Sequence, residues 1–226
     1  MTERQITSRT GKDYLPQAVD LLSSVFKNDP VLTYMLSSLD ETARYAFFPR
    51  YFHSILTAAV LNKASISEID DWKACAVLIP PGERVDNPRT WFQAGLIPLL
   101  WNMGFSGSKK TLFEYGTLTD GVKERTLGKG SRYYYVFFAG TREDARKQGF
   151  ASDIIKQYQE KAANDNVPLW LEATTSYSRD LYARLGFKLI DEVVLGKGSA
   201  SPDGLQMKGG EGVRLWAMVW ESPRHP

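Results

Sequence analysis

The sequence predicts an α/β fold in a single domain, because strand-like and helix-like segments alternate along the whole chain. In the C-terminal half, residues 133–139 form an unbroken apolar and aromatic run, which is typical of a strand buried on both faces. The segment that follows, residues 150–162, places apolar residues on one helical face and charged residues on the other. No internal repeat and no linker divides the chain, so one domain is expected to span residues 1–226.

The N-terminal half predicts three helices and a hairpin. Apolar residues recur at helical spacing in the first helix, and Asn28-Asp29-Pro30 ends it. The last of the three helices is expected to be kinked or divided by Pro49, and the hairpin to turn at Asp70-Asp71. The helices are expected at residues 15–26, 31–36 and 41–62, and the strands at residues 5–7, 65–69 and 72–79.

Residues 87–128 are rich in aromatic side chains and are interrupted by Pro98 and several glycines. They predict two or three short helices that form a cap, whose aromatic residues either pack in the core or wall a binding pocket. Residues 196–212 are rich in glycine but no helix follows them, so they predict a mobile loop and not a phosphate-binding loop. The remaining elements are expected to be a strand at 167–173, a helix at 177–185, and strands at 186–195 and 213–220.

Composition excludes several classes of protein. The chain has 28 Lys and Arg against 26 Asp and Glu, so it lacks the excess of positive charge that is typical of nucleic-acid-binding proteins. The N-terminus lacks an apolar signal segment, and no apolar run approaches the roughly 18 residues that a membrane span needs. Cys75 is the only cysteine, and the two histidines are too few and too scattered for a metal centre. A cytoplasmic monomer or homodimer without metal is expected.

An anion-binding turn is predicted where the helix of residues 150–162 begins. A helix start leaves backbone N–H groups without intrahelical partners and carries the positive end of the helix dipole. Gly149 has no Cβ to keep a phosphate away from the backbone, and the motif is neither a Walker loop nor a three-glycine dinucleotide fingerprint. A tight strand-to-helix turn without a ligand explains the motif equally well. The turn consists of Arg146, Lys147, Gln148, Gly149, Phe150, Ala151 and Ser152.

Two downstream elements favour the anion-binding interpretation. They are the strand end Leu171-Glu172-Ala173-Thr174 and the segment Tyr182-Ala183-Arg184-Leu185-Gly186-Phe187. With the Arg-x-x-Gly-x-Ala turn, they resemble the GCN5-related N-acetyltransferase (GNAT) family. The resemblance is closest to the puromycin N-acetyltransferase branch, which has a similar Gly-Thr step, here Gly140-Thr141. The chain departs from the family pattern at Glu143, Ala151 and Thr175, where the family has Pro, Gly and Asn.

The resemblance implies a mixed, mostly antiparallel sheet whose fourth and fifth strands splay apart, with a helical insertion before the fourth strand. It implies acetyl-CoA as co-substrate and direct attack by a small-molecule amine in a ternary complex. The backbone N–H of Ala139 would bind the thioester oxygen, and Tyr182 would protonate the departing thiolate. The implied cofactor-binding residues are Ala139, Gly140, Thr141, Arg146, Lys147, Gln148, Gly149, Phe150, Ala151, Ser152, Thr175, Ser178 and Tyr182.

Other assignments stay open. Glu172, at the end of a largely apolar strand, is either a paired structural carboxylate or the base that deprotonates the acceptor, directly or through water. Tyr182 is otherwise a helix tyrosine that packs on the sheet. The alternatives for function are a protein or peptide N-acetyltransferase, which needs an open acidic groove, and an acyl-CoA-binding module without catalysis.

Overall fold

The structure is a computed structural model that describes residues 4–222, without the side chains of residues 105–106 and 111–113. No helix in this described part is long and apolar enough to cross a membrane. In chain order the elements are β1 (Ile6–Thr10), α1 (Leu15–Val25), α2 (Pro30–Met35), α3 (Glu41–Leu61), β2 (Ser65–Ile69), β3 (Ala74–Ile79), α4 (Pro88–Trp91), α5 (Leu96–Lys109), the π-helix η1 (Lys110–Tyr115), α6 (Gly116–Leu127), β4 (Tyr134–Thr141), the 3-10 helix η2 (Glu143–Ala145), α7 (Phe150–Asn164), β5 (Leu169–Ala173), α8 (Ser176–Arg184), β6 (Lys188–Leu195) and β7 (Val213–Trp220).

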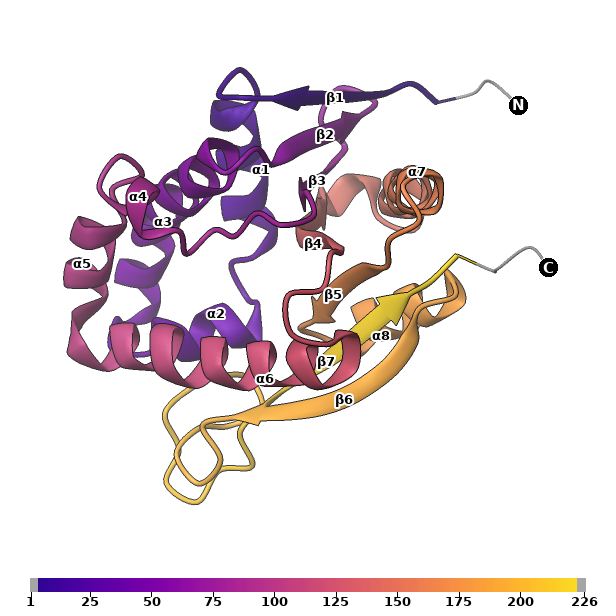
Figure 1. Ribbon diagram of the computed structural model, residues 1–226. Coiled ribbons are helices and arrows are strands. Elements are labelled where there is room, and N and C mark those ends of the chain that lie inside the picture. The colour runs from indigo at the N-terminus through magenta and orange to yellow at the C-terminus, as the bar shows by residue number, and fades with distance from the viewer. Residues whose placement is uncertain (1–3, 223–226) are drawn as a thin grey trace.

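The strands form one mixed sheet in the order β1-β2-β3-β4-β5-β7-β6 (Figure 1). Neighbours pair antiparallel except β4 and β5, which are parallel. The α/β class and the mostly antiparallel sheet that the resemblance implied are therefore confirmed.

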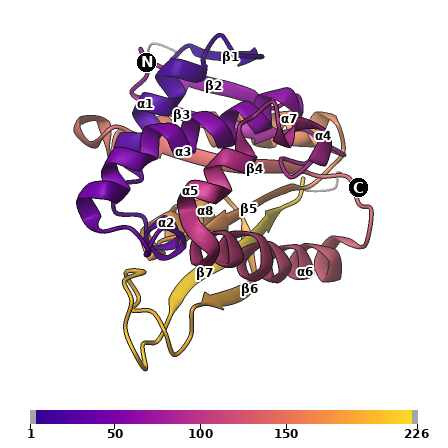
Figure 2. The ribbon, with the colours of Figure 1, turned by 90° about the vertical axis from the view of Figure 1, so that its left-hand side faces the viewer.

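Helices cover both faces of the sheet (Figure 2). One core cluster joins α1, α2, α3, α5 and α6 to one face and includes the fully buried Trp170 of β5. The other core cluster joins α7 and α8 to the opposite face and includes Leu171 of the same strand. Because successive residues of a strand point to opposite faces, β5 contributes to both clusters, as its apolar sequence indicated.

Two N-terminal predictions can be compared with the structure. Pro49 was expected to kink or divide its helix, and α3 runs undivided from Glu41 to Leu61 with Pro49 inside it. The hairpin turn is longer than Asp70-Asp71, because Trp72 also has a positive φ of 62°. Its backbone N–H donates to Glu68 Oε2 at 3.1 Å, so Trp72 belongs to the turn and β3 begins at Ala74.

The predicted cap is the helical insertion between β3 and β4, made of α4, α5, η1 and α6. Gly104 interrupts α5 with a φ of 71° and a ψ of 172°, which no helical residue adopts. Apolar side chains of the insertion, among them Leu99 and Met103, are buried in the cluster beneath α3. The insertion is thus part of the core and not a separate unit.

The glycine-rich loop of residues 196–212 packs closely on α2. A Cβ on Gly204 would lie 2.2 Å from the carbonyl oxygen of Pro30, so only glycine fits there. The N–H of Gly196 donates to Glu114 Oε1 at 2.6 Å, and the hydroxyl of Tyr34 donates to Glu114 Oε2 at 2.7 Å. These contacts tie the loop to α2 and η1, in contrast to the open, mobile loop that its composition suggested.

Gly140 in β4 allows α1 to approach the sheet. A Cβ at this position would lie 3.1 Å from Leu22 Cδ2 and 3.2 Å from Val25 Cγ1. Both distances are shorter than ordinary van der Waals contact, so a side chain here would push α1 away. Close packing thus explains this glycine without any ligand.

We expect Gly140→Val to lower the free energy of unfolding by about 1–3 kcal/mol, the usual cost of overpacking a core. Urea denaturation measures the change. Adding Leu22→Ala to Gly140→Val should make room for the new side chain, so the double variant should lose less stability than the sum of the two single variants. Strict additivity would contradict the proposed clash.

Candidate active site

The two central parallel strands are joined only where they begin. β4 and β5 pair at Tyr134 with Leu169 and at Tyr135 with Trp170, and no pairing follows. Further along β4, Ala139 and Thr141 pair only with β3, on the other side. The edge of β4 that faces β5 is therefore unpaired beyond Tyr135, which is the splay that the resemblance implied.

Backbone directions at the splay follow from one hydrogen bond. The N–H of Arg142 donates to the carbonyl oxygen of Lys73, the residue before β3, at 2.8 Å. Because backbone groups alternate sides along an antiparallel strand, Gly140 also bonds toward β3, whereas the N–H groups of Ala139 and Thr141 point into the splay. The N–H of Ala139 thus faces the gap between the strands, and its contact with the thioester oxygen stays a prediction.

The predicted anion-binding turn has the backbone conformation that such a turn needs. Lys147 and Gly149 have positive φ values of 63° and 89°, and Gly149 is the N-cap of α7. No side chain caps this helix, so the N–H groups of Ala151 and Ser152 are available to a ligand. Phe150 itself is buried in the core, so it can offer only its backbone.

Arg4 is an unpredicted neighbour of this turn. Its Nη1 donates to the carbonyl oxygen of Gln148 and to Asp153 Oδ2, each at 2.8 Å. Its guanidinium carbon lies 4.4 Å from the centre of the Phe150 ring. The N-terminal segment is thereby fixed against the start of α7, over a separation of about 145 residues that no local sequence pattern could indicate.

Tyr182 lies on α8 and is 8% exposed. Its ring packs against Phe187 at 5.6 Å between centroids, in the cluster formed with α7. Burial raises the pKa of Tyr182 to about 12, so its hydroxyl keeps its proton throughout the neutral range. The core-packing and acid interpretations are therefore compatible, since a buried, protonated hydroxyl is what a proton donor requires.

Thr175 and Ser178 form a capping box at the start of α8. The hydroxyl oxygen of Thr175 accepts from the N–H of Ser178 at 3.1 Å, and the N–H of Thr175 donates to Ser178 Oγ at 3.2 Å. These hydrogen bonds satisfy backbone donors at the start of α8. Their predicted contact with the cofactor stays a prediction, and the structure gives both residues a structural role.

Glu172 sits in a buried polar cluster. One carboxylate oxygen accepts from the hydroxyl of Tyr135 at 2.6 Å, and the other accepts from Trp170 Nε1 at 2.7 Å. The ammonium of Lys123 on α6 lies 3.1 Å from Glu172, and the two side chains are 10% and 2% exposed. Burial lowers the pKa of Lys123, but the charges of Glu172, Tyr133 and Asp120 and the hydrogen bond to Glu172 together raise it overall, so Lys123 is a cation.

Asp29 is a second buried carboxylate near the splay, which the sequence indicated only as the end of a helix. Its Oδ1 accepts from the N–H of Leu32 at 3.0 Å and caps α2, and its Oδ2 accepts from the hydroxyl of Thr174 at 2.5 Å. Thr174 directly follows β5. Burial raises the pKa of Asp29, and these two hydrogen bonds offset the effect only in part.

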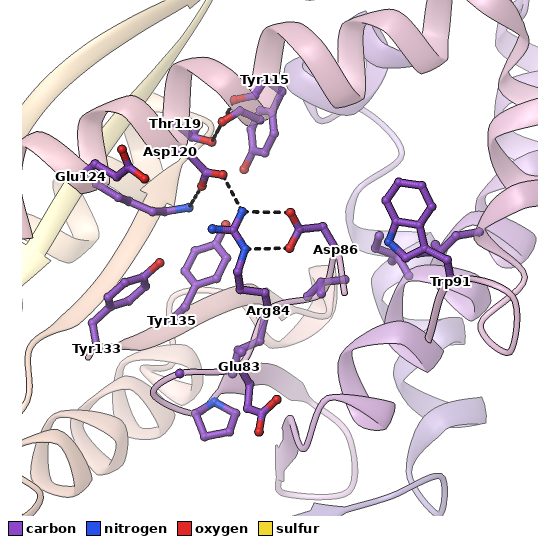
Figure 3. A pocket seen from close by; sticks show the side chains of 18 of the residues that line it. Glu83, Arg84, Asp86, Trp91, Tyr115, Thr119, Asp120, Glu124, Tyr133 and Tyr135 are labelled. Atoms are coloured by element: carbon purple, nitrogen blue, oxygen red, sulfur yellow. Dashed lines mark hydrogen bonds and ion pairs between the residues drawn. The ribbon is translucent and has the colours of Figure 1, made fainter. Parts of the chain in front are cut away.

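A cavity of about 470 Å³ lies between the insertion and the start of β4 (Figure 3). Tyr133 and Tyr135 line it from the sheet, Tyr51 from α3, and Lys123 from α6. Tyr135 and Tyr51 link the cavity to the buried carboxylates Glu172 and Asp29. The hydroxyl of Tyr135 donates to Glu172. Burial raises the pKa of Tyr51, and the charge of Asp29 raises it further. Among the described residues, no group of His, Cys, Asp or Glu could hold a metal ion.

Part of the chain is similar to a known domain. Residues 121–201 match the model of the acetyltransferase (GNAT) domain, a segment that contains the splay, the anion-binding turn and Tyr182. The chain is also similar to an uncharacterised N-acetyltransferase of Schizosaccharomyces pombe, with 22% identity over 177 residues that cover 78% of this chain and 71% of that protein.

Solved structures share the fold over almost the whole chain. The structure titled histone acetyltransferase HPA2 and related acetyltransferase, from Corynebacterium glutamicum, has a TM-score of 0.58 at 19% identity and covers 99% of this chain and 98% of its own. Arylalkylamine N-acetyltransferase 2 of Aedes aegypti has a TM-score of 0.60 at 16% identity, covering 96% and 99%. The chain therefore shares the fold of solved acetyltransferases, and its residues 121–201 match the acetyltransferase (GNAT) domain.

Proposed function

We propose that this chain transfers the acetyl group of acetyl-CoA directly to a small-molecule amine. The observation that carries the proposal is the 470 Å³ cavity lined by Tyr135, the last residue of β4 that pairs with β5 before the two strands separate. The cavity shares Tyr135 and Lys123 with the buried Glu172, so a molecule inside it lies next to the strand pair where the splay begins. A volume of this size is typical of small-molecule sites.

The C-terminal end of β4 and the turn before α7 provide backbone donors that could bind acetyl-CoA. The splay offers the N–H groups of Ala139 and Thr141 to the pantetheine arm, and the uncapped start of α7 offers further N–H groups to the pyrophosphate. The side chains of Arg146 and Lys147 are exposed near this turn and add positive charge. The side of Gly149 where a Cβ would stand has only Arg4 Nη1 within 4 Å, at 3.5 Å.

The chemistry requires one proton to leave the amine and one to reach the thiolate. The neutral amine attacks the thioester carbon, and the N–H of Ala139 stabilises the oxygen as it becomes negative. When the carbon–sulfur bond breaks, the Tyr182 hydroxyl protonates the thiolate and the amide is released. A tyrosine with a raised pKa is fully protonated at neutral pH and can serve in this step.

Two carboxylates compete as the base that accepts the amine proton. Glu172 was the prediction from the sequence, but its oxygens already accept hydrogen bonds from Tyr135 and Trp170 and face the Lys123 cation. Both oxygens of Glu172 are therefore already engaged by buried partners. Asp29 has a pKa raised by burial, which suits a base that works near neutral pH, so we favour Asp29.

The other functions have less support. A peptide acetyltransferase needs an open groove, whereas this cavity is walled by α3, α5, α6 and the start of β4. A module without catalysis would need Tyr182 only for packing, which phenylalanine could supply as well. Among the structural neighbours, one is titled an arylalkylamine N-acetyltransferase and thus acts on a small amine. The puromycin N-acetyltransferase branch and a cytoplasmic location stay predictions from the sequence.

Gly149→Val should weaken acetyl-CoA binding at least about tenfold, because a branched side chain would stand where the pyrophosphate approaches. Gly149 has a φ of 89°, so valine also strains the turn, at about 1–3 kcal/mol. Gly11→Val is the matched control, since Gly11 has a φ of 86° with nothing within 4 Å of an added Cβ. Calorimetric titration of both variants with acetyl-CoA checks the effect, and equal weakening in both would refute a phosphate site at Gly149.

Tyr182→Phe should lower kcat by roughly 10²-fold or more while acetyl-CoA affinity is nearly kept, because only the proton donor is lost. The ring would still pack on Phe187. Steady-state kinetics with a binding titration measure both quantities. Wild-type turnover in the variant would assign Tyr182 to packing alone.

Asp29→Asn should lower kcat/KM by about 10²-fold or more, because asparagine can still cap α2 but cannot accept the proton. In the wild-type protein the rate should rise with pH as Asp29 loses its proton, and in the variant this limb should flatten. Glu172→Gln serves as the matched control, with its main effect on melting temperature because it uncouples Lys123. The opposite result, a flattened pH–rate limb only in Glu172→Gln, would make Glu172 the base.

A further inference from the structure

We infer that Arg4 is a positioning residue for the turn before α7, which it holds in the conformation that receives the diphosphate of acetyl-CoA. This inference rests on the proposed function, and Arg4 lies outside the segment that matches the acetyltransferase domain, residues 121–201. The guanidinium contacts the carbonyl oxygen of Gln148, the ring of Phe150 and the carboxylate of Asp153. One side chain from the N-terminal segment thus holds the start of α7 at three points.

The contact with the Gln148 carbonyl fixes the direction of the next N–H group. Arg4 Nη1 donates to this oxygen at 2.8 Å. In a trans peptide the C=O and N–H bonds point in opposite directions. The N–H of Gly149 is therefore directed away from the guanidinium and remains free to donate to an anion.

The turn holds several backbone donors without backbone partners. In the described part of the chain, no backbone carbonyl accepts from the N–H groups of Gln148, Gly149 or Ala151. Lys147 and Gly149 have positive φ values, and Gln148 between them does not. Such an alternation turns successive N–H groups toward one concave side, which is an anion-binding arrangement. Rotation of the Gln148–Gly149 peptide would destroy it, and the hydrogen bond from Arg4 opposes that rotation.

Arg4 also neutralises a carboxylate that would repel a phosphate. Asp153 lies in the first turn of α7, and its Oδ2 accepts from Arg4 Nη1 at 2.8 Å. The two side chains are 34% and 40% exposed, and an ion pair this exposed typically contributes little to stability. Its main consequence is electrostatic, because without Arg4 the negative charge of Asp153 would act directly on an incoming diphosphate.

Lys73 offers a matched comparison at the same ring. Its Nζ lies 5.4 Å from the centre of the Phe150 ring, whereas the guanidinium carbon of Arg4 lies 4.4 Å from it. The ammonium of Lys73 donates to Asp70, in the turn between β2 and β3, at 2.6 Å. Removing Lys73 therefore takes away a positive charge beside Phe150 but leaves the hydrogen bond from Arg4 to the turn in place.

The test measures the affinity of wild type, Arg4→Met and Lys73→Met for coenzyme A, inorganic pyrophosphate and pantetheine. Calorimetry gives the affinity for coenzyme A, and competition against coenzyme A gives the two weaker affinities. Arg4→Met should weaken coenzyme A and pyrophosphate at least about fivefold, because the turn must then be ordered when the ligand binds. Pantetheine lacks the diphosphate, so its affinity should not change. Lys73→Met should keep the wild-type affinity for all three probes.

A conservative variant and a double variant separate positioning from charge. Arg4→Lys should retain most of the affinity for coenzyme A, because one ammonium can donate to both oxygens that Arg4 Nη1 contacts. Adding Asp153→Asn to Arg4→Met removes the unpaired carboxylate but does not restore the hydrogen bond to Gln148, so recovery should be incomplete. Full recovery would reduce Arg4 to a counter-ion of Asp153 and overturn the inference.

Three other results would also overturn the inference. They are wild-type affinity for coenzyme A in Arg4→Met, an equal loss for pantetheine, and an equal loss in Lys73→Met. Circular dichroism and melting temperature confirm that each variant is folded. The proposed function fails separately: a wild-type protein that binds coenzyme A in this pattern but acetylates no amine would reject transfer and keep the role of Arg4. Acetylation of amines with no effect of Arg4→Met would do the reverse.

Discussion

The ion pair between Lys123 and Glu172 joins the helical insertion to the central sheet. Its atoms lie 3.1 Å apart and both side chains are nearly inaccessible to solvent, so each charge depends on the other. Removing one partner of such a pair typically costs about 3–5 kcal/mol, because the remaining charge is buried without compensation. The position of α6 over β4 and β5, and with it one wall of the cavity, therefore depends on this contact. Tyr135 and Trp170 complete the cluster by donating to the same carboxylate.

β4 connects the two halves of the site. Its start, with Tyr135, faces the cavity for the acceptor, and its end leads through η2 to the turn before α7. Between them, the strand leaves β5 and exposes backbone donors at Ala139 and Thr141. A donor that enters from the turn and an acceptor that enters from the insertion would meet along a single strand. This arrangement favours direct transfer, since no side chain needs to carry the acetyl group between separate sites.

Much of the fold and part of the candidate site could be predicted from the sequence, and the features that could not be predicted have physical causes. The strand of β4, the amphipathic α7 and the anion-binding turn depend on local patterns that periodicity and helix-start rules describe. Lys123 could not be recognised, because a lysine on a helix is usually solvated and its burial depends on a carboxylate some fifty residues away. Asp29 was visible only as a helix boundary, since its partner Thr174 lies 145 residues further along the chain. The insertion was expected to be helical with interruptions at glycines, and the interruption of α5 lies at Gly104, as the low helix propensity of glycine indicates.

The loop of residues 196–212 has a consequence for how this site can evolve. Surface loops usually tolerate substitution and insertion because little depends on their backbone. Here Gly204 fits against the first residue of α2, and Asp29 is the residue that caps that helix. A substitution of Gly204 would therefore displace the start of α2 and, with it, the Asp29 carboxylate, which lies far from the loop along the chain. Homologues that vary in this loop should therefore carry matching changes in α2. Covariation between the two segments would reflect the close contact between Gly204 and Pro30.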